Sequence, residues 1–244
     1  MTGRLRWQGW RPLPAARWAE GAGAWIDLSH PLREDLARIP FFPPARFDRV
    51  MSIPSDPMNV TEMHMVCHFG THVDAPCHFL PDGPAFHDIP LERLYGPGVV
   101  WQIDAEPFQT IGAATLERLR PTLEPGDIVL LDTGWAAHFG TPRYAENPAL
   151  GLDAADWLID RGAKLIAVDF ATPDLAVSRR PPGFDWPVHH ALLSRGVLIA
   201  EHVTNLRPLT GRRVEAMFLA LSIHGADGGP ARVVARPLQE EGRA

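Results

Sequence analysis

Residues 68–79 read His68-Phe69-Gly70-Thr71-His72-Val73-Asp74-Ala75-Pro76-Cys77-His78-Phe79. Three histidines and one aspartate fall within eleven of these positions. Imidazole and carboxylate are the common side-chain ligands of a borderline divalent metal such as zinc. Gly70 permits a tight turn between His68 and His72, and Pro76 stiffens the return toward His78. The stretch therefore predicts a metal-binding loop; the alternative is a surface loop that is rich in histidine by chance.

Two extended segments, residues 46–53 and 58–67, lead the chain into this loop. The second segment shows the period of two that is typical of a strand: Met63, Met65 and Cys67 alternate with Glu62, His64 and Val66. His64 and Val66 share a face in this pattern. His64 is therefore interpreted as a packed core histidine, with a functional role as the alternative.

Apolar runs alternate with helical stretches between about residues 98 and 201, which is typical of an α/β domain with a partly parallel sheet. Asp153 is the expected N-cap of the first longer helix, and Pro187 fits the first position of the second. Strands are expected at 98–103, 127–131, 164–168 and 197–200, and helices at 154–161 and 187–195.

Length and composition favour a soluble globular protein. The chain has 244 residues, and 45% of them are hydrophobic, which is enough for a sizeable core. We expect an N-terminal arm over residues 1–24, in which Trp7, Trp10 and Trp18 need cover, and a single domain over residues 25–244.

The net charge and the lack of a predicted targeting signal limit the kinds of partner that we expect for this protein. The net charge is −6 without a basic block, so nucleic acid is not an expected partner. No apolar run reaches the ~18 residues of a membrane span, and no secretory signal follows the first residues, so we expect a cytoplasmic protein with no membrane contact. Cys67 and Cys77 are interpreted as free thiols beside a pocket, with a disulfide as the alternative.

Further candidate ligands come from late in the chain. His189 begins a predicted helix, and Glu201 stands where a buried strand ends, where a carboxylate must be paired or bound. The alternatives are helix capping for His189 and a salt bridge to arginine for Glu201. Asp169 and Asp174 are interpreted as loop and cap residues, with ligand binding as the alternative. The chain has no G-x-S-x-G, H-E-x-x-H, P-loop or G-x-G-x-x-G motif, so those chemistries have no visible site.

The stretch from His68 to Phe79 resembles, at every defined position, the H-x-G-T-H-x-D-x-P-x-H-F signature of the cyclase-like metal-dependent hydrolase family. Bacterial kynurenine formamidases and isatin hydrolases belong to that family. The resemblance extends over roughly residues 25–237, with supportive matches at 27–32, 127–135, 169–174, 189–205 and 225–228. It implies a swivelling β/β/α domain, with a mixed, partly parallel sheet or barrel-like core, in a homo-oligomer such as a dimer or tetramer.

The resemblance also implies roles for individual residues. His68 and His72 would bind a first metal ion, His189 a second, and Asp74 and Glu201 both. The ions would be one or two Zn²⁺, with Mn²⁺ as the alternative. His78 would be the catalytic acid/base. The resemblance thus implies one catalytic residue, His78, and five metal ligands: His68, His72, Asp74, His189 and Glu201.

One departure concerns the substrate. The family's aromatic-proline-glycine step is replaced here by Phe42-Pro43-Pro44, so Phe42 is the candidate substrate-binding residue. We expect a metal-dependent hydrolase of an amide-type bond, acting on a small molecule such as the aryl formamide N-formylkynurenine or a cyclic amide. The alternatives are a metal-dependent cyclase or dehydratase of a biosynthetic pathway and a non-enzymatic metal-binding module.

Overall fold

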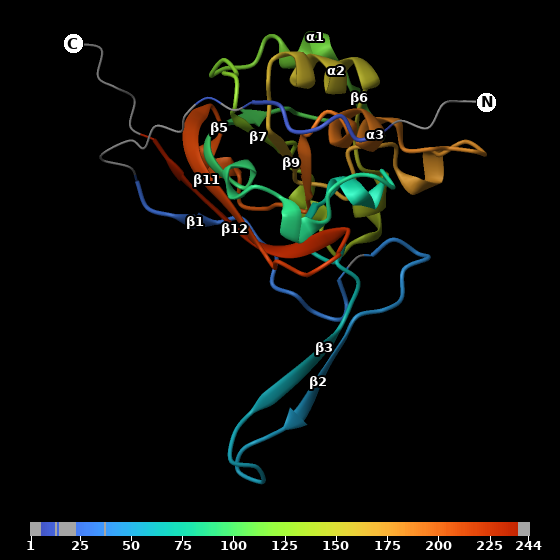
Figure 1. Ribbon diagram of the computed structural model, residues 1–244, viewed down its shortest axis with the longest axis vertical. Helices are drawn as coiled ribbons and strands as arrows, with labels where there is room; N and C mark the ends of the chain where they lie inside the picture. The colour runs from blue at the N-terminus through green and yellow to red at the C-terminus, as the bar shows by residue number, and fades with distance from the viewer. Residues whose placement is uncertain (1–5, 13, 15–22, 37, 239–244) are drawn as a thin grey trace.

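The computed structural model describes residues 6–12, 14, 23–36 and 38–238. Its centre is a β-sheet that closes on itself, with helices on one side and a long hairpin that projects from the other (Figure 1). The barrel strands are β4 (His72–Asp74), β5 (Tyr95–Gln102), β7 (Ile128–Asp132), β9 (Leu165–Val168), β10 (Leu198–Glu201), β11 (Arg212–Ala220) and β12 (Gly228–Pro237).

The strand order is β12-β11-β5-β7-β9-β10-β4, and β4 pairs with β12 to close the ring. The four strands β5, β7, β9 and β10 run parallel, and the remaining pairings in the ring are antiparallel. A short strand, β1 (Ile26–Asp27), adds to the outside edge of β12. The expected mixed, partly parallel sheet is confirmed, and it takes the barrel-like form.

Apolar residues of the parallel strands are buried on both faces. In β7, Ile128 and Leu130 join the core inside the barrel, whereas Val129 and Leu131 join the core beneath the helices. Strands covered on both faces read as continuous apolar runs, which is why the sequence marks them clearly. The covering helices are α1 (Ala113–Leu116), α2 (Leu152–Asp160) and α3 (Pro187–Ser194).

Pro187 begins α3 as expected, but the expected N-cap of α2 is wrong. Gly151 precedes α2, and Asp153 lies inside its first turn. The Asp153 carboxylate instead accepts a hydrogen bond of 2.9 Å from the backbone N–H of Ala113 at the start of α1. The Asp153 carboxylate therefore caps the start of α1, whereas the sequence pattern predicted that it would cap α2.

The remaining elements are short and lie around the barrel. β6 (Thr110–Ile111) and β8 (Ala149–Leu150) form a parallel pair. The 3-10 helices are Pro76–His78, Phe86–Asp88, Leu91–Arg93, Trp135–His138, Pro142–Glu146, Val177–Arg179 and Arg207–Leu209. Among the described helices, none has the length and apolar character to cross a membrane.

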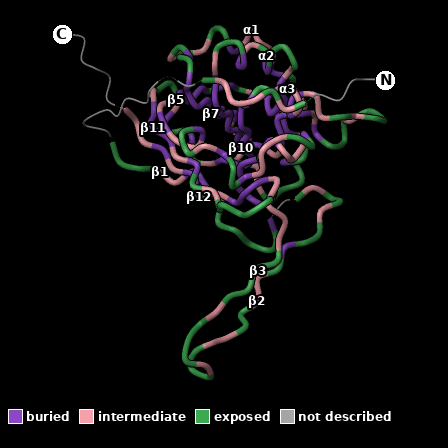
Figure 2. Tube along the Cα trace, viewed as in Figure 1, coloured by how far each residue is buried: buried purple, intermediate pink, exposed green. Residues whose placement is uncertain are grey.

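The two segments before the metal-binding loop form the projecting hairpin, β2 (Arg46–Met51) and β3 (Val60–His64) (Figure 1). Most of it is exposed (Figure 2). The interpretation of His64 as a packed core histidine is wrong: its side chain is 52% exposed and pairs with Glu62. The reason is that a two-stranded ribbon standing away from the barrel has no layer to cover either face.

The described part of the N-terminal arm rests on the barrel domain. The backbone N–H of Trp7 donates to the Asp82 carboxylate at 3.1 Å, and the Arg93 guanidinium lies 4.7 Å from the Trp10 ring centre. Trp18 lies outside the described residues. The division into an arm over 1–24 and a domain over 25–244 stays a prediction.

Candidate metal centre

The candidate ligands meet because β4 lies between β12 and β10 in the barrel. Glu201 is paired with His72 across the antiparallel β10–β4 ladder, and Asp74 is paired with Ile199. His189 comes from α3, which packs beside β10. β4 and two later consecutive elements, α3 and β10, thus bring their polar side chains to one place.

The inner cluster consists of His72, Asp74, His189 and Glu201, and all four residues are buried. His189 Nε2 lies 3.6 Å from Asp74 Oδ2 and 3.3 Å from Glu201 Oε1. His72 Nε2 lies 3.3 Å from Asp74 Oδ1 and 3.4 Å from Glu201 Oε2. Ligand atoms of Asp74, His189 and Glu201 all lie within 4.8 Å of one another, which is the spacing of side chains around a shared cation.

Partners outside the cluster orient both imidazoles. His72 Nδ1 lies 2.8 Å from the carbonyl oxygen of Gly70, and His189 Nδ1 lies 2.6 Å from Asp174 Oδ2. A ring N–H that donates outward leaves Nε2 as the atom that faces the cluster, the usual arrangement of a histidine that binds metal. Gly70 has a φ of +65°, which is the left-handed conformation that glycine favours.

Two buried atoms of the cluster, His72 Nε2 and Asp74 Oδ2, have no hydrogen-bond partner among the described residues. A buried polar atom without a partner is costly, and a cation at this place satisfies both. The donors are imidazole nitrogens and carboxylate oxygens, the set preferred by Zn²⁺ and by similar divalent ions. The residues present therefore fit a divalent metal; their assignment as ligands stays a prediction.

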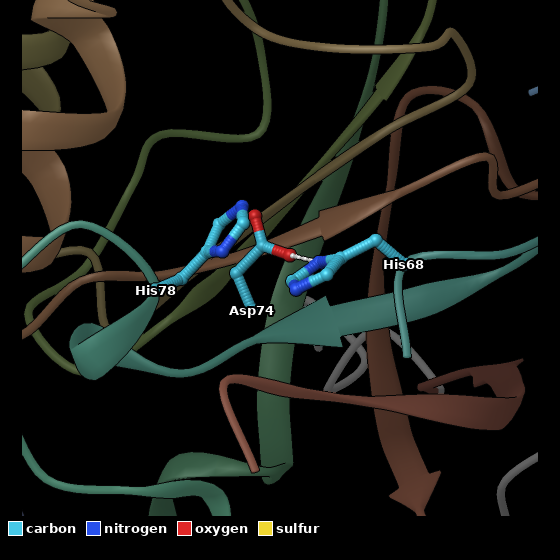
Figure 3. A group of neighbouring side chains, drawn as sticks. All are labelled: His68, Asp74 and His78. Atoms are coloured by element: carbon cyan, nitrogen blue, oxygen red, sulfur yellow. Dashed lines mark hydrogen bonds and ion pairs between the residues drawn. The ribbon is translucent and has the colours of Figure 1, made fainter. Parts of the chain in front are cut away.

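His68 and His78 form an outer group beside this cluster (Figure 3). His68 Nδ1 lies 2.8 Å from Asp74 Oδ1, and the His68 and His78 rings stack with centres 3.8 Å apart. Asp227 joins them, with Oδ2 at 3.1 Å from His68 Nε2 and 3.5 Å from His78 Nδ1. The candidate site thus gains a carboxylate that the sequence pattern marked only within the resemblance at 225–228.

Charges in the site shift the pKa values of its members. Burial opposes protonation of His68, but hydrogen bonds with Asp227 and Asp74 raise its pKa to about 10. Burial disfavours the charged form of Asp74, but the neighbouring His189, His68 and His72 rings hold the pKa of that carboxyl well below its usual range. Protons on the imidazoles thus balance the carboxylates, and a divalent cation supplies the same positive charge in their place.

His202 and Tyr144 are site residues that the sequence reasoning missed. His202 follows Glu201 directly, and a ring nitrogen of His202 lies within 4.8 Å of ligand atoms of His72 and Glu201. Its Nδ1 lies 2.8 Å from the Tyr144 hydroxyl, and its φ of +57° is unusual for a residue other than glycine. Its position next to Glu201 was the one local signal.

Several other candidates take structural roles. Asp169 accepts hydrogen bonds from the backbone N–H and the hydroxyl of Thr133, and its burial raises the pKa of the carboxyl to about 6. Asp174 accepts the backbone N–H groups of Val188 and His189 at the start of α3, which is the cap role expected for it. Both cysteines are free, as expected, but neither borders the cavity described next.

A cavity of about 590 Å³ opens over the cluster, and its size falls within the range of small-molecule sites. His68, His78, His189 and Glu201 border it on one side. Much of the remaining wall is apolar and includes Ile39, Phe41, Phe42, Phe79, Val177 and Trp186. The candidate metal centre therefore faces a space that is large enough for a small molecule. The role of Phe42 in contacting substrate stays a prediction.

The sequence is similar to those of known proteins. A family model described as "Putative cyclase" matches residues 26–175. The chain is 33% identical over 216 residues to the kynurenine formamidase of Bacillus mycoides (strain KBAB4), which covers 88% of this chain and 98% of that protein. A second relative, the kynurenine formamidase of Bacillus anthracis, is 32% identical over the same shares.

Solved structures share the fold. Isatin hydrolase A from Ralstonia solanacearum aligns with a TM-score of 0.78 at 24% identity, over 88% of this chain and 92% of that chain. A structure described as a potential metal-dependent hydrolase with cyclase activity aligns with a TM-score of 0.73 at 24% identity, over 89% and 99%.

Proposed function

The chain belongs to the cyclase family, and from this premise we propose that it is a metal-dependent hydrolase of an amide-type bond. The proposed substrate is an aryl formamide resembling N-formylkynurenine, or a cyclic amide, because the similar Bacillus proteins are kynurenine formamidases and a protein of the same fold is an isatin hydrolase. The observation that carries the proposal is the convergence of four buried donor side chains beneath a largely apolar cavity.

The proposed ligands are His68, His72, Asp74, His189 and Glu201. Asp74 and Glu201 each direct one carboxylate toward two histidines, which supports a shared role if two ions are present. The proposed metal is Zn²⁺, with Mn²⁺ as the alternative. When bound at such a site, divalent ions lower the pKa of water toward neutral and polarise a carbonyl oxygen.

His78 is the proposed acid/base. Its side chain is 22% exposed and borders the cavity, whereas the proposed ligands are buried more deeply. Asp227 lies beside Nδ1, which leaves the other ring nitrogen for proton exchange. In this role His78 takes a proton from the attacking water and returns it to the leaving nitrogen, so that formamide and water become amine and formate. Histidine suits both steps because its ordinary pKa lies near neutral pH.

Phe42 is the proposed aromatic contact for the substrate. Its ring centre lies 6.4 Å from that of His68, and it lines the cavity wall. A phenyl ring offers a face for stacking but no N–H donor, so the part of the substrate that lies on it is expected to be apolar.

The test uses the full chain, stripped of metal with a chelator and then reloaded with Zn²⁺ or Mn²⁺. Bound metal is counted by mass spectrometry, and N-formylkynurenine is supplied while formate and kynurenine are measured. We expect equimolar formate and kynurenine only from the reloaded protein. Full metal occupancy without formate release from N-formylkynurenine or ring opening of isatin overturns the proposal.

We also propose that the protein is a homo-oligomer in the cytoplasm, with the β2–β3 hairpin as a contact between copies. Isolated two-stranded hairpins are marginal in water, and this one exposes Val50, Ile53, Met58 and Met63. The two free cysteines support a reducing compartment. Light scattering on Met63→Glu combined with Val50→Glu tests the contact: a smaller assembly than the wild type is expected, and an unchanged assembly contradicts it.

A further inference from the structure

We propose that Arg180 binds a carboxylate on the substrate, so that the site selects aryl amides that carry such a group at a distance from the scissile bond. This inference rests on the proposed function and names the feature of the substrate that the cavity recognises. It concerns the part of the cavity wall where Arg180 follows the 3-10 helix Val177–Arg179.

Arg180 is half-buried in the cavity wall with most of its donors unused. Its Nε donates to the carbonyl oxygen of Leu175 at 2.9 Å. Its guanidinium carbon lies 5.3 Å from the ring centres of both Phe184 and Trp186. Within the described part of the chain, no carboxylate lies within ion-pair distance of this guanidinium. Arginine has five N–H donors, and the terminal amino groups of this half-buried side chain have no protein acceptor among the described residues, so they are free to bind an anion from outside.

The nearby carboxylates are already engaged. Burial lowers the pKa of Arg180, and the charges of Asp174 and Glu201 oppose that shift. Asp174 is held by the start of α3 and by the His189 ring, and Glu201 faces His72 and His189. A guanidinium is charged at any physiological pH, and neither carboxylate forms with Arg180 the two parallel hydrogen bonds that a guanidinium makes with a carboxylate.

Arg38, the other arginine of the cavity wall, is used differently. It is exposed, and its Nη1 donates to the carbonyl oxygens of Ile39, Pro40 and Phe42. It therefore shapes the loop that carries Phe41 and Phe42. Arg180 remains as the arginine of this wall whose terminal amino groups are available to a ligand.

The ligand chemistry follows from these surroundings. Phe79 and Trp186 line the same cavity and provide aromatic surface for an aryl ring. A planar guanidinium braced on aromatic rings recognises a planar carboxylate through a bidentate contact. The substrate class is therefore an aryl amide with a carboxylate side chain, such as the amino-acid side chain of N-formylkynurenine, and a neutral aryl amide leaves Arg180 without a partner.

The test compares each carboxylate ligand with its methyl ester, which removes the charge and keeps the rest of the molecule. The proteins are the wild type, Arg180→Gln, Arg180→Lys and the control Arg179→Gln. Arg179 is the adjacent residue, lies over the Phe108 ring at 4.2 Å and does not line the cavity. Turnover is measured with N-formylkynurenine and its methyl ester, and binding by calorimetry with kynurenine and its methyl ester.

We expect Arg180→Gln to lower kcat/KM for N-formylkynurenine about 10–100-fold, mainly through KM, as for a lost hydrogen bond to a charged group. The methyl ester should change less than about threefold, Arg180→Lys should retain part of the preference, and Arg179→Gln should equal the wild type. Kynurenine should bind the wild type at least about tenfold more tightly than its ester. If Arg180→Gln does not fold, Arg180→Lys and this wild-type comparison decide.

The two proposals fail in different ways. An unchanged acid-to-ester preference in Arg180→Gln, or no preference in the wild type, overturns the role of Arg180 whether or not the protein hydrolyses formamides. Absence of hydrolysis with fully loaded wild type, while kynurenine binding still depends on Arg180, overturns the proposed formamidase activity and leaves the carboxylate site in place.

Discussion

Asp174 offers a sharp test of the candidate metal centre because it never touches the proposed metal. It is 1% exposed, accepts the backbone N–H groups of Val188 and His189 at 3.1 Å each, and lies 2.6 Å from His189 Nδ1. Asp174→Asn keeps the size of the side chain but replaces one acceptor oxygen by an NH₂ donor. That donor must then face one of the three N–H groups, so at least one hydrogen bond is lost. In one orientation of the amide the His189 ring loses its acceptor, and in the other a neutral oxygen replaces the carboxylate that holds it, so the ring is held more weakly in both.

Two consequences are expected. Loss of an outer hydrogen bond to a histidine ligand typically lowers metal affinity about 10–100-fold. Loss of a buried capping interaction lowers the free energy of unfolding by about 2 kcal/mol, or a Tm decrease of about 4–8 °C for a domain of this size. Competition with a chromophoric chelator measures the first, and thermal unfolding of the metal-free protein measures the second.

Asp153→Asn is the matched control. Asp153 also accepts a backbone N–H at a helix start, at 2.9 Å, but it is exposed and borders neither the cluster nor the cavity. It should lower stability slightly and leave metal affinity unchanged. The reasoning is refuted if Asp174→Asn binds metal as tightly as the wild type, or if Asp153→Asn weakens binding equally.

Three further predictions concern individual histidines. His72→Ala should lose both metal and activity, because the removed Nε2 faces two carboxylates; full occupancy by metal analysis would show that His72 is not a ligand. His78→Ala should keep its metal while kcat falls about 10²–10⁴-fold; near-wild-type kcat at full occupancy rules out the acid/base role. Burial, with a smaller contribution from Arg33, lowers the pKa of His30 to about 4, so the unfolded chain binds more protons between about pH 6.5 and 4, and stability falls as the pH drops through that range. Urea unfolding should show a smaller acid loss for His30→Phe, which keeps the ring stacked on Phe139; equal losses in both proteins contradict the assignment.

Local residue patterns were sufficient to predict those parts of the structure that depend on residues close together in the sequence. The apolar runs of β7, β9 and β10 are visible because these strands are buried on both faces. The metal-binding loop at 68–79 can be recognised from the sequence because its four candidate donor side chains lie within eleven consecutive positions. Pro187 marks the start of α3 for the same reason, since proline prefers the first turn of a helix.

Local patterns predicted the wrong role for a residue whose surroundings depend on segments that are distant in the sequence. Asp153 resembles the cap of its own helix but bonds to Ala113, forty residues away. His64 lies on an alternating strand, yet the hairpin stands clear of any covering layer. Alternation reports which residues share a face and says nothing about what lies against that face.

By itself, the sequence determined the types of the candidate ligands, the loop that carries three of them and the partly parallel sheet. Only the tertiary structure decided that β4 closes the barrel between β10 and β12, and this places Glu201 opposite His72. The same closure brings Asp227 to His78, and the packing around α3 brings Asp174 to His189. These contacts join residues up to 149 positions apart. Strand order and packing determine which distant residues meet. Many different local sequences are compatible with the same strand order, so these contacts cannot be predicted from any single segment.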